Sequence, residues 1–458
     1  MKPVVVVGAG ISGLALAFEL RRLGLPVLVL EGDRRAGGKI ESDHRDGYLC
    51  ERGPASYLDR SGSIAAVAKA LGIEGRVLLA GDAAERRLVA ANGRLHDTPA
   101  TAASFVASSL LPWTAKLRAG LDLVLPRGPS AHGQDESVAA FARRRLGRVA
   151  GERLLQPLVS GLYAGDPEQV SLPAAFPLVA AMERDQRSFM LAMRKEFAAA
   201  KRKAAPRLAS FRDGLDELPA ALAAHLGQDL HLGTRVLRVG KDESGFRVTV
   251  DDNGQTQMLQ AEALVMAIPA HVGTSVLSSL DGAIAGLLAQ IPYVPVTLVH
   301  LGYPEAALPR PLDAYGFFVP PSEPLRVLGG IFPSQFLAQR APAGFHLFSV
   351  RTGGARHPEA YTMPEADLVA LAHGELRGLM GLETAPSFVH IVRHERALPQ
   401  YTLGHMDRVA GLEEGARRHP GLFFHGNAYH NAGVPELVSR SLKLAVRVAS
   451  FVQSPSRG

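Results

Sequence analysis

The residues best suited to chemistry are three closely spaced glycines near the N-terminus and one acid that follows them. Residues 4–7 are four valines, enough for a short strand buried on both faces, and Gly8, Gly10 and Gly13 come directly after them. In this spacing Gly8 allows a tight turn, Gly10 lets the backbone approach a pyrophosphate, and Gly13 lets a helix pack closely on the strand. Glu31 stands near the ~20-residue spacing of a carboxylate that hydrogen-bonds an adenosine ribose. The pattern favours a dinucleotide-binding site over an ordinary tight turn.

Three elements must hold these residues in place. The sequence predicts a strand at residues 4–7, a helix at 12–23 and a second strand at 25–30, with Leu14 and Phe18 on the sheet side of the helix. The free N–H groups and the positive dipole end of the helix would then face the phosphates.

Two further glycine turns follow the acid. Gly37 and Gly38 precede the basic residue Lys39, and a strand within residues 47–57 runs into the turn at Gly53 and Pro54. The backbone can approach phosphate at the first turn, and the amides of the second could reach a flavin ring. The alternative for the first is an exposed glycine turn.

Length and composition exclude several classes of protein. With 458 residues the chain is expected to form two or three domains, and 47% hydrophobic residues are typical of a globular protein. The net charge of +6 favours anionic partners, but the basic residues are dispersed and aromatic residues make up 6%, which argues against nucleic acid. Cys50 is the only cysteine, so an intrachain disulfide is excluded and a reducing compartment fits. We see no secretory signal, no apolar run of about 18 residues, no metal-binding histidine pair, no Gly-x-Ser-x-Gly elbow and no phosphate-binding lysine loop.

The glycine segments resemble the flavoproteins of the monoamine-oxidase and phytoene-desaturase superfamily. The matching residues are the glycine triplet with Glu31, Arg-Ala-Gly-Gly at 35–38 and Glu-Arg-Gly-Pro-Ala-Ser-Tyr at 51–57. Gly-Leu-Tyr-Ala-Gly-Asp at 161–166, Pro-Gln-Tyr-Thr-Leu-Gly-His at 399–405 and the segments 426–429 and 433–435 narrow the resemblance to the oxygen-dependent protoporphyrinogen oxidases. It covers nearly the whole chain.

The resemblance implies an α/β fold with three parts. A Rossmann-type FAD-binding domain would be assembled from residues 1–84, 207–275 and 386–458, a mixed-sheet substrate domain would occupy 276–385, and an inserted helical domain 85–206. Apolar patterning predicts helices at 136–146 and 180–203 within the insertion. In the resembled family this insertion associates with membranes. Lipid contact around Phe105, Leu110, Leu111 and Trp113 is therefore one interpretation, and an inward-facing helical core is the other.

The cofactor implied is FAD, bound by backbone groups and by the helix predicted at residues 436–451, whose N-terminus would face flavin N1. The cofactor-binding residues expected from the glycine pattern and the resemblance are Gly8, Ala9, Gly10, Ile11, Ser12, Gly13, Glu31, Gly32, Gly38, Lys39, Gly53, Pro54, Ala55, Ser56, Val236, Gly426, Asn427, Gly433, Val434 and Pro435. No metal site is expected.

The residues implied as lining the substrate site are Phe318, Ile331, Arg351 and Gly165. Arg351 departs from the family, where an apolar or aromatic residue is expected. Its guanidinium could clamp a substrate propionate or pair with a structural acid. Residues 99–103 carry only proline, alanine and threonine where some relatives place Arg or Asn for the propionate. We therefore hypothesise that Arg351 compensates.

The activity implied is oxidation of protoporphyrinogen IX to protoporphyrin IX with dioxygen, releasing hydrogen peroxide. No protein group is assigned as catalytic beyond the position of flavin N5. The alternatives are the same chemistry on coproporphyrinogen III, a flavin amine oxidase or carotenoid desaturase, and a non-catalytic flavin-binding or membrane-scaffold protein. The partners expected are the tetrapyrrole and dioxygen, with peripheral contact to the inner face of the cell membrane and a homodimer left open. A cytoplasmic location is expected.

Overall fold

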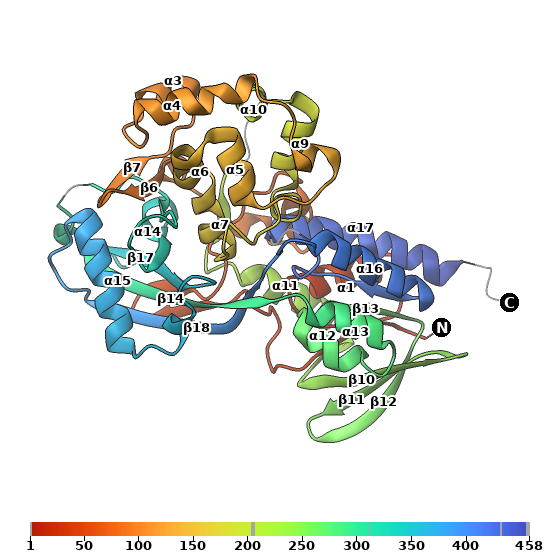
Figure 1. Cartoon of the computed structure of the whole chain (residues 1–458). Coiled ribbons are helices and arrows are strands. Elements are labelled where there is room, and N and C mark those ends of the chain that lie inside the picture. The colour runs from red at the N-terminus through yellow and green to blue at the C-terminus, as the bar shows by residue number, and fades with distance from the viewer. Residues whose placement is uncertain (1, 203–206, 310, 431–432, 455–458) are drawn as a thin grey trace.

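The computed structural model describes residues 2–202, 207–309, 311–430 and 433–454, and the sheets and helices below are those formed by these residues. Figure 1 shows three regions. Helices α3 to α10 lie at the top, a large sheet with helix α15 lies at the lower left, and a parallel sheet with helices α1 and α17 lies at the right, above a smaller antiparallel sheet. The chain is thus an α/β protein with a helical insertion.

The N-terminal valines form the centre of a five-stranded parallel sheet. Its order is β19 (Leu422–Phe424), β13 (Ala263–Met266), β1 (Val4–Val7), β2 (Val27–Glu31) and β9 (Leu230–Leu232). Helices α1 (Ile11–Arg22), α2 (Ser63–Ala70), α11 (Glu217–Leu226) and α17 (Val434–Gln453) bury a common core with one face of this sheet. The predicted strand, turn and helix are confirmed, and Leu14 and Phe18 are buried.

A three-stranded antiparallel sheet covers the other face together with α12 (Ala270–Leu277), α13 (Gly282–Ala289) and α16 (His405–Arg418). Its strands are β10 (Thr234–Asp242), β11 (Gly245–Asp252) and β12 (Gln255–Ala261). The single strand predicted at residues 230–239 is wrong, because Gly233 takes a φ of 72° and the chain leaves one sheet for the other there. The polar strand β12 was not predicted.

The seven-stranded mixed sheet separates an apolar core from a cavity. Its order is β18 (Phe388–Pro399), β14 (Tyr293–Pro304), β17 (Phe345–Gly353), β16 (Val327–Ile331), β15 (Gly316–Phe318), β6 (Arg87–Ala91) and β7 (Arg94–Asp97). Alternate residues such as Val299, Leu301 and Val350 pack under α15 (Glu365–Met380). Their neighbours, such as Leu298 and Arg351, face the opposite side and line the cavity.

The pairing of this sheet leads us to propose a change at two of the predicted domain boundaries. Residues 87–97, predicted as part of the helical insertion, form β6 and β7, and β6 pairs with β15. Residues 388–399, predicted with the FAD domain, pair with β14. We therefore place both stretches with the mixed-sheet domain, because strand pairing joins them to it.

The helical segment runs from α3 to α10. Its helices are α3 (Ala102–Ala107), α4 (Trp113–Gly120), α5 (Val138–Leu146), α6 (Arg148–Leu154), α7 (Gln156–Tyr163), α8 (Leu172–Ala175), α9 (Pro177–Gln186) and α10 (Phe189–Arg202). The helix predicted at 180–203 is instead two helices, because Arg187 takes a φ of 66° between them. Lys203 and Pro206, where the predicted helix and segment end, lie outside the described residues. Leu110 and Leu111 belong to the core of this segment, so the predicted lipid contact is wrong for these two residues.

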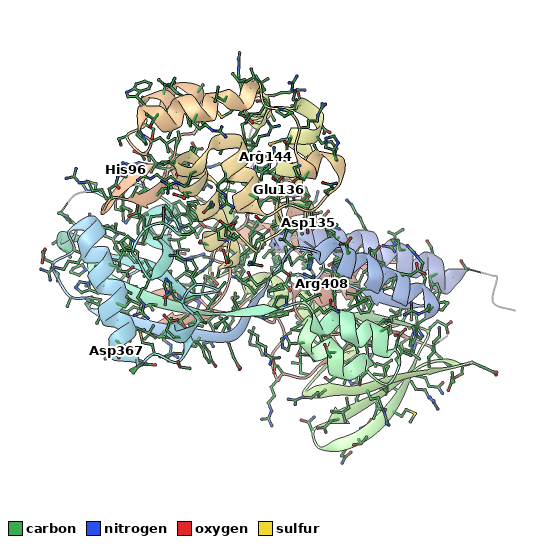
Figure 2. The ribbon with its side chains drawn as sticks, viewed as in Figure 1. His96, Asp135, Glu136, Arg144, Asp367 and Arg408 are labelled. Carbon is green, nitrogen blue, oxygen red and sulfur yellow. The ribbon has the colours of Figure 1, made fainter. Side chains whose placement is uncertain are left out.

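A buried ion network joins several elements inside the helical segment. Arg145 is fully buried and pairs with Glu183 at 2.7 Å and with Asp122 at 3.2 Å. Arg144 bridges Glu183 and Glu136 at 2.8 Å each, and Figure 2 shows Arg144 and Glu136 side by side within this segment. Among the described residues, no helix is long and apolar enough to cross a membrane.

Candidate active site

A single cavity of about 1800 Å³ lies where the parallel sheet meets the mixed sheet. It reaches from Glu31, at the carboxyl end of β2, to Arg351 in β17. Pockets for one ligand usually enclose roughly 300–1,000 Å³, so the cavity has room for two. Ligands of open parallel sheets bind at the carboxyl ends of the strands, which is where its first part lies.

The glycine turn after β1 leaves open space for a phosphate. Gly8 takes a φ of 103°, and a Cβ added there would come within 2.7 Å of the carbonyl oxygen of Ala267. A Cβ added at Gly13 would come within 1.9 Å of the carbonyl oxygen of Gly8. By contrast, a Cβ at Gly10 would meet no atom within 4 Å, and Gly10 lines the cavity. The turn is therefore tight where it packs and open where a dinucleotide would approach, which fits FAD.

Glu31 and the second glycine turn are both hydrogen-bonded to the first glycine turn. The Glu31 carboxylate accepts hydrogen bonds from the backbone N–H of Ala9 at 2.7 Å and of Asp33 at 3.0 Å. The N–H of Gly37 donates to the carbonyl of Ala9 at 2.8 Å. The exposed Arg35 donates to the carbonyl of Ile40 at 3.0 Å, which ties the two ends of this second turn together.

Two helices direct their N-termini into the cavity. Ser12 in the first turn of α1 and Val434 in the first turn of α17 both line it, and the two helices pack on each other (Figure 1). The Ser441 hydroxyl of α17 donates to the carbonyl of Ser12 at 3.0 Å, and the Ser63 hydroxyl donates to the carbonyl of Pro435 at 2.9 Å. Their dipoles add positive potential at two points, suited to a pyrophosphate and to the N1 side of a flavin.

The conspicuous segment at residues 399–405 links the helical segment to the loop before α17. The Tyr401 hydroxyl is buried and is shared between the carbonyl oxygens of Asn427 and His430, at 2.5 Å each. Asp135 accepts from the N–H of Gly404 at 2.6 Å, and Figure 2 shows Asp135 between the helical segment and α16. This segment therefore positions the loop rather than lining the cavity itself.

Most of the predicted cofactor residues line the cavity. Those that do are Gly8, Gly10, Ile11, Ser12, Glu31, Gly32, Gly38, Lys39, Gly53, Pro54, Ala55, Ser56, Val236, Gly426, Asn427, Gly433, Val434 and Pro435. Ala9 and Gly13 lie behind the lining and shape the turn. Burial lowers the pKa of the Lys39 ammonium. The contacts of these residues with FAD stay a prediction.

The mixed sheet brings three of the predicted substrate residues onto one face. Phe318, Ile331 and Arg351 all line the cavity, on three neighbouring strands. Gly165 does not, because it packs on Gln400, whose Oε1 would lie 2.5 Å from an added Cβ.

Arg351 has no acidic partner within ion-pair distance among the described residues. Its Nη1 donates to the carbonyl of Gly161 in α7, and burial without a carboxylate lowers its pKa. The structural ion pair considered from the sequence is therefore not formed there. A half-buried guanidinium with unused donors beside a cavity is suited to a carboxylate ligand.

Sequence reasoning missed several polar residues of the cavity wall. These are Arg87, Tyr315, His271, His300, Ser349 and His394. The signal that could have found Ser349 is its place two residues before Arg351, because alternate residues of a strand share a face. Among the described residues, no group of His, Cys, Asp and Glu could hold a metal ion.

Glu51 should give the protein a stability that falls as pH rises. Burial raises the pKa of this carboxyl from its usual 4.5 to about 7, although it accepts hydrogen bonds from Ser42 and from the N–H of Leu215. The folded protein therefore holds a proton that the unfolded chain releases between pH 4.5 and 7. At pH 8, Glu51→Gln should be the more stable by up to about 3 kcal/mol, and this difference should shrink towards pH 5. Urea unfolding at both pH values tests this.

The exposed Glu85, changed in the same way, is the control and should show no such difference. An equal effect of Glu51→Gln at pH 5 and pH 8 would contradict the assignment.

Comparison with known proteins gives one family and two named activities. The model of the flavin-containing amine oxidoreductases matches residues 11–449. The chain is 32% identical to the chloroplast protoporphyrinogen oxidase of Nicotiana tabacum, over 98% of this chain and 85% of that protein. It is 30% identical to the coproporphyrinogen III oxidase of Bacillus subtilis (strain 168), over 96% of both chains.

Solved structures show the same fold. A protein of Exiguobacterium sp. 255-15, provisionally assigned as a protoporphyrinogen oxidase, superposes with a TM-score of 0.82 at 25% identity over 98% of both chains. Cyclohexylamine oxidase of Brevibacterium oxydans IH-35A superposes with a TM-score of 0.70 at 18% identity, over 99% of this chain and all (100%) of that one, which shows the fold alone.

Proposed function

We propose that this chain, which belongs to the family of flavin-containing amine oxidoreductases, oxidises protoporphyrinogen IX to protoporphyrin IX with dioxygen and releases hydrogen peroxide. Its cofactor is FAD. The observation that carries the proposal is that one cavity joins the glycine cradle to an apolar sheet face on which Arg351 has no acidic partner among the described residues. The relatives at 32% and 30% identity bear the names of porphyrinogen oxidases, which supports this substrate class.

The residues of the chain supply orientation and electrostatics. Bound FAD supplies the redox chemistry, taking electrons from the macrocycle and passing them to dioxygen. Val296, Leu298 and Ile331 form an apolar surface on which a tetrapyrrole can rest, and Phe318 lines the same cavity. Arg351 anchors one carboxylate at the edge of this surface.

The function is tested with the FAD-loaded protein. Anaerobic addition of protoporphyrinogen IX should bleach the absorption of oxidised flavin. Admission of air should restore it, with the appearance of porphyrin fluorescence and hydrogen peroxide. Flavin that stays oxidised would overturn the proposal, and bleaching by a primary amine instead would favour an amine oxidase.

Oxidation of coproporphyrinogen III is the second candidate, and Arg87 favours it. Arg87 lines the same cavity, with its guanidinium 5.5 Å from the ring centre of Tyr315 and no ion pair to an acid among the described residues. A second cation suits a substrate with four carboxylates. Values of kcat/KM for both substrates separate the candidates, and Arg87→Met should reduce only the value for coproporphyrinogen III.

Arg351→Met should raise KM for the porphyrinogen about 10- to 100-fold, because one charge-assisted hydrogen bond to a carboxylate is lost. The kcat should change little, since the carboxylate is remote from the reacting bridge. Arg351→Lys is the matched control. It keeps the charge without the two-pronged geometry and should fall between wild type and Met. An unchanged KM in the Met variant would refute the carboxylate clamp.

We also propose that helix α4 and the turn that follows it, residues 113–124, contact an anionic membrane surface peripherally. Trp113, Leu117 and Val124 are 64%, 72% and 69% exposed, and Lys116 lies over the Trp113 ring at 4.6 Å. An apolar ridge with basic residues beside it is suited to the headgroup region of a bilayer. The homodimer stays an expectation, to be tested by size-exclusion chromatography.

The membrane contact is tested by sedimentation with vesicles of phosphatidylglycerol and phosphatidylcholine. The triple variant Trp113→Ser, Leu117→Ser, Val124→Ser should lose at least about 90% of binding, because each exposed apolar side chain contributes when it is buried in lipid. Leu178→Ser, which is 67% exposed on α9, is the control. Wild-type protein that stays in the supernatant would exclude the contact.

A further inference from the structure

Ser349 and His300 form a polar pair within the apolar wall of the substrate part of the cavity. They face each other across β17 and β14, and His300 Nδ1 lies 2.7 Å from Ser349 Oγ. Both line the cavity. Ile331 lies opposite Ser349 on the next strand, and Leu298 lies two residues before His300 on the same face of β14. The function proposed above gives this pair no task, yet a buried polar pair costs free energy unless its groups find partners.

The surroundings of His300 keep its imidazole neutral. Its side chain is 1% exposed. Burial lowers its pKa to about 3, and His390 and Arg52 act in the same direction, while Asp43 and the backbone of Glu51 act against them. The imidazole is therefore neutral and carries one N–H.

Ser349 Oγ keeps an acceptor lone pair whichever nitrogen of His300 carries the proton. Nδ1 is engaged with Ser349, and Nε2 is buried without a hydrogen-bond partner among the described residues. When Nδ1 accepts the hydroxyl proton, both lone pairs of Oγ stay free, and when Nδ1 donates, one lone pair stays free. In either case Oγ can accept a hydrogen bond from a donor in the cavity that it lines.

We propose that Ser349 Oγ accepts a hydrogen bond from a pyrrole N–H of the porphyrinogen, and that His300 is the positioning residue that holds the hydroxyl in this role. The inference rests on the proposed function. A porphyrinogen carries four pyrrole N–H donors at its centre, and its nitrogen lone pairs belong to the aromatic rings and do not accept. A wall that recognises this centre must therefore offer an acceptor.

The same acceptor distinguishes substrate from product. The bridges of a porphyrinogen are saturated, so the macrocycle bends and its N–H groups can point out of the mean plane towards a wall. The porphyrin is conjugated and flat, and its N–H groups point into the ring centre, out of reach of a side chain on either face. Ser349 therefore favours binding of the reduced macrocycle and not of the oxidised one.

The place of Arg351 agrees with this arrangement. Ser349 and Arg351 are two residues apart on the cavity face of β17, about 7 Å along the strand. In the substrate, a carboxylate on the rim of the macrocycle is likewise displaced from the N–H groups at its centre. One strand thus offers a cation to the rim and an acceptor to the centre.

Ser349→Ala tests the inference in the FAD-loaded protein. We expect KM for the porphyrinogen to rise about 5- to 10-fold, while Kd for the product porphyrin, measured by fluorescence titration, stays within about 2-fold of wild type. Ser349→Thr keeps the hydroxyl and should restore KM. An unchanged KM would overturn the proposal, because it would show that Ser349 makes no contact with the substrate. A product Kd that rises as much as KM would also overturn it, because it would show a general loss of the pocket.

A second variant guards against misfolding of the first. His300→Phe keeps the buried ring but frees the Ser349 hydroxyl to rotate, so KM should rise by about 2- to 3-fold with FAD content unchanged. A fall in KM would overturn the role of His300. Wild-type protein that does not oxidise porphyrinogens would refute the proposed function. If the wild-type protein oxidises them and Ser349→Ala has the same KM, only this inference is refuted.

Discussion

Apoprotein carrying Gly13→Ala is expected to bind FAD at least about 100-fold more weakly than wild type. The new Cβ would lie 1.9 Å from the carbonyl oxygen of Gly8, and that atom belongs to the backbone of the turn itself. Relief of the clash must move α1 away from β1 and so displace the N–H groups that face the phosphates. Fluorescence titration with FAD gives the affinity, and circular dichroism shows whether the fold is kept.

Two glycines provide matched comparisons. An added methyl at Gly10 meets no protein atom within 4 Å, so a loss of FAD binding in Gly10→Ala would come from contact of the methyl group with FAD itself. Gly374 is exposed on α15 and is equally free of contacts, so Gly374→Ala should bind FAD as wild type does and be more stable by about 1 kcal/mol. Retention of FAD by both cradle variants would exclude this turn as the dinucleotide site.

Arg145→Leu is expected to destabilise the helical segment by about 3–5 kcal/mol. The substitution removes a fully buried cation and leaves the Asp122 carboxylate without its ion-pair partner. Glu183 keeps Arg144 at 2.8 Å but loses Arg145 at 2.7 Å. Unfolding in urea, followed by circular dichroism at a helical wavelength, measures the loss.

Arg148→Leu is the matched control on the next helix. Arg148 is 74% exposed and lies 3.7 Å from Glu152, so its removal should cost no more than about 1 kcal/mol. If both leucine variants unfold at the same urea concentration, the buried network contributes no net stability. In that case the pairing of Arg145 only offsets the cost of burying its charge.

The cofactor half of the molecule could be predicted because its signals are local. Gly8, Gly10 and Gly13 lie within one turn and one helix, and the spacing of the three marks the turn even though the close contact at Gly8 comes from the distant Ala267. Glu31 ends the next strand and reaches back to Ala9. Short-range spacing is sufficient to specify such a unit.

The substrate half could be predicted only in part, because it depends on register between distant strands. Ser349 meets His300, 49 positions earlier in the chain, only because β17 pairs with β14. Residues 87–97 join the sheet through β15, far along the chain, and no local pattern announces that pairing. Leu110 and Leu111 have the composition of a lipid contact, and only tertiary packing shows that they are buried.

The interleaving of the mixed sheet sets a problem for the chain during its synthesis. The β6–β7 hairpin leaves the ribosome early, but β15 follows much later and β18 later still. At about 5–20 residues per second, residues 98–315 take roughly 11–44 s to appear. Throughout that interval the apolar residues Leu88 and Val89 have no strand to pair with on their inner edge. A nascent chain with such an unpaired edge is a natural client for a chaperone that shields hydrophobic hairpins until translation ends.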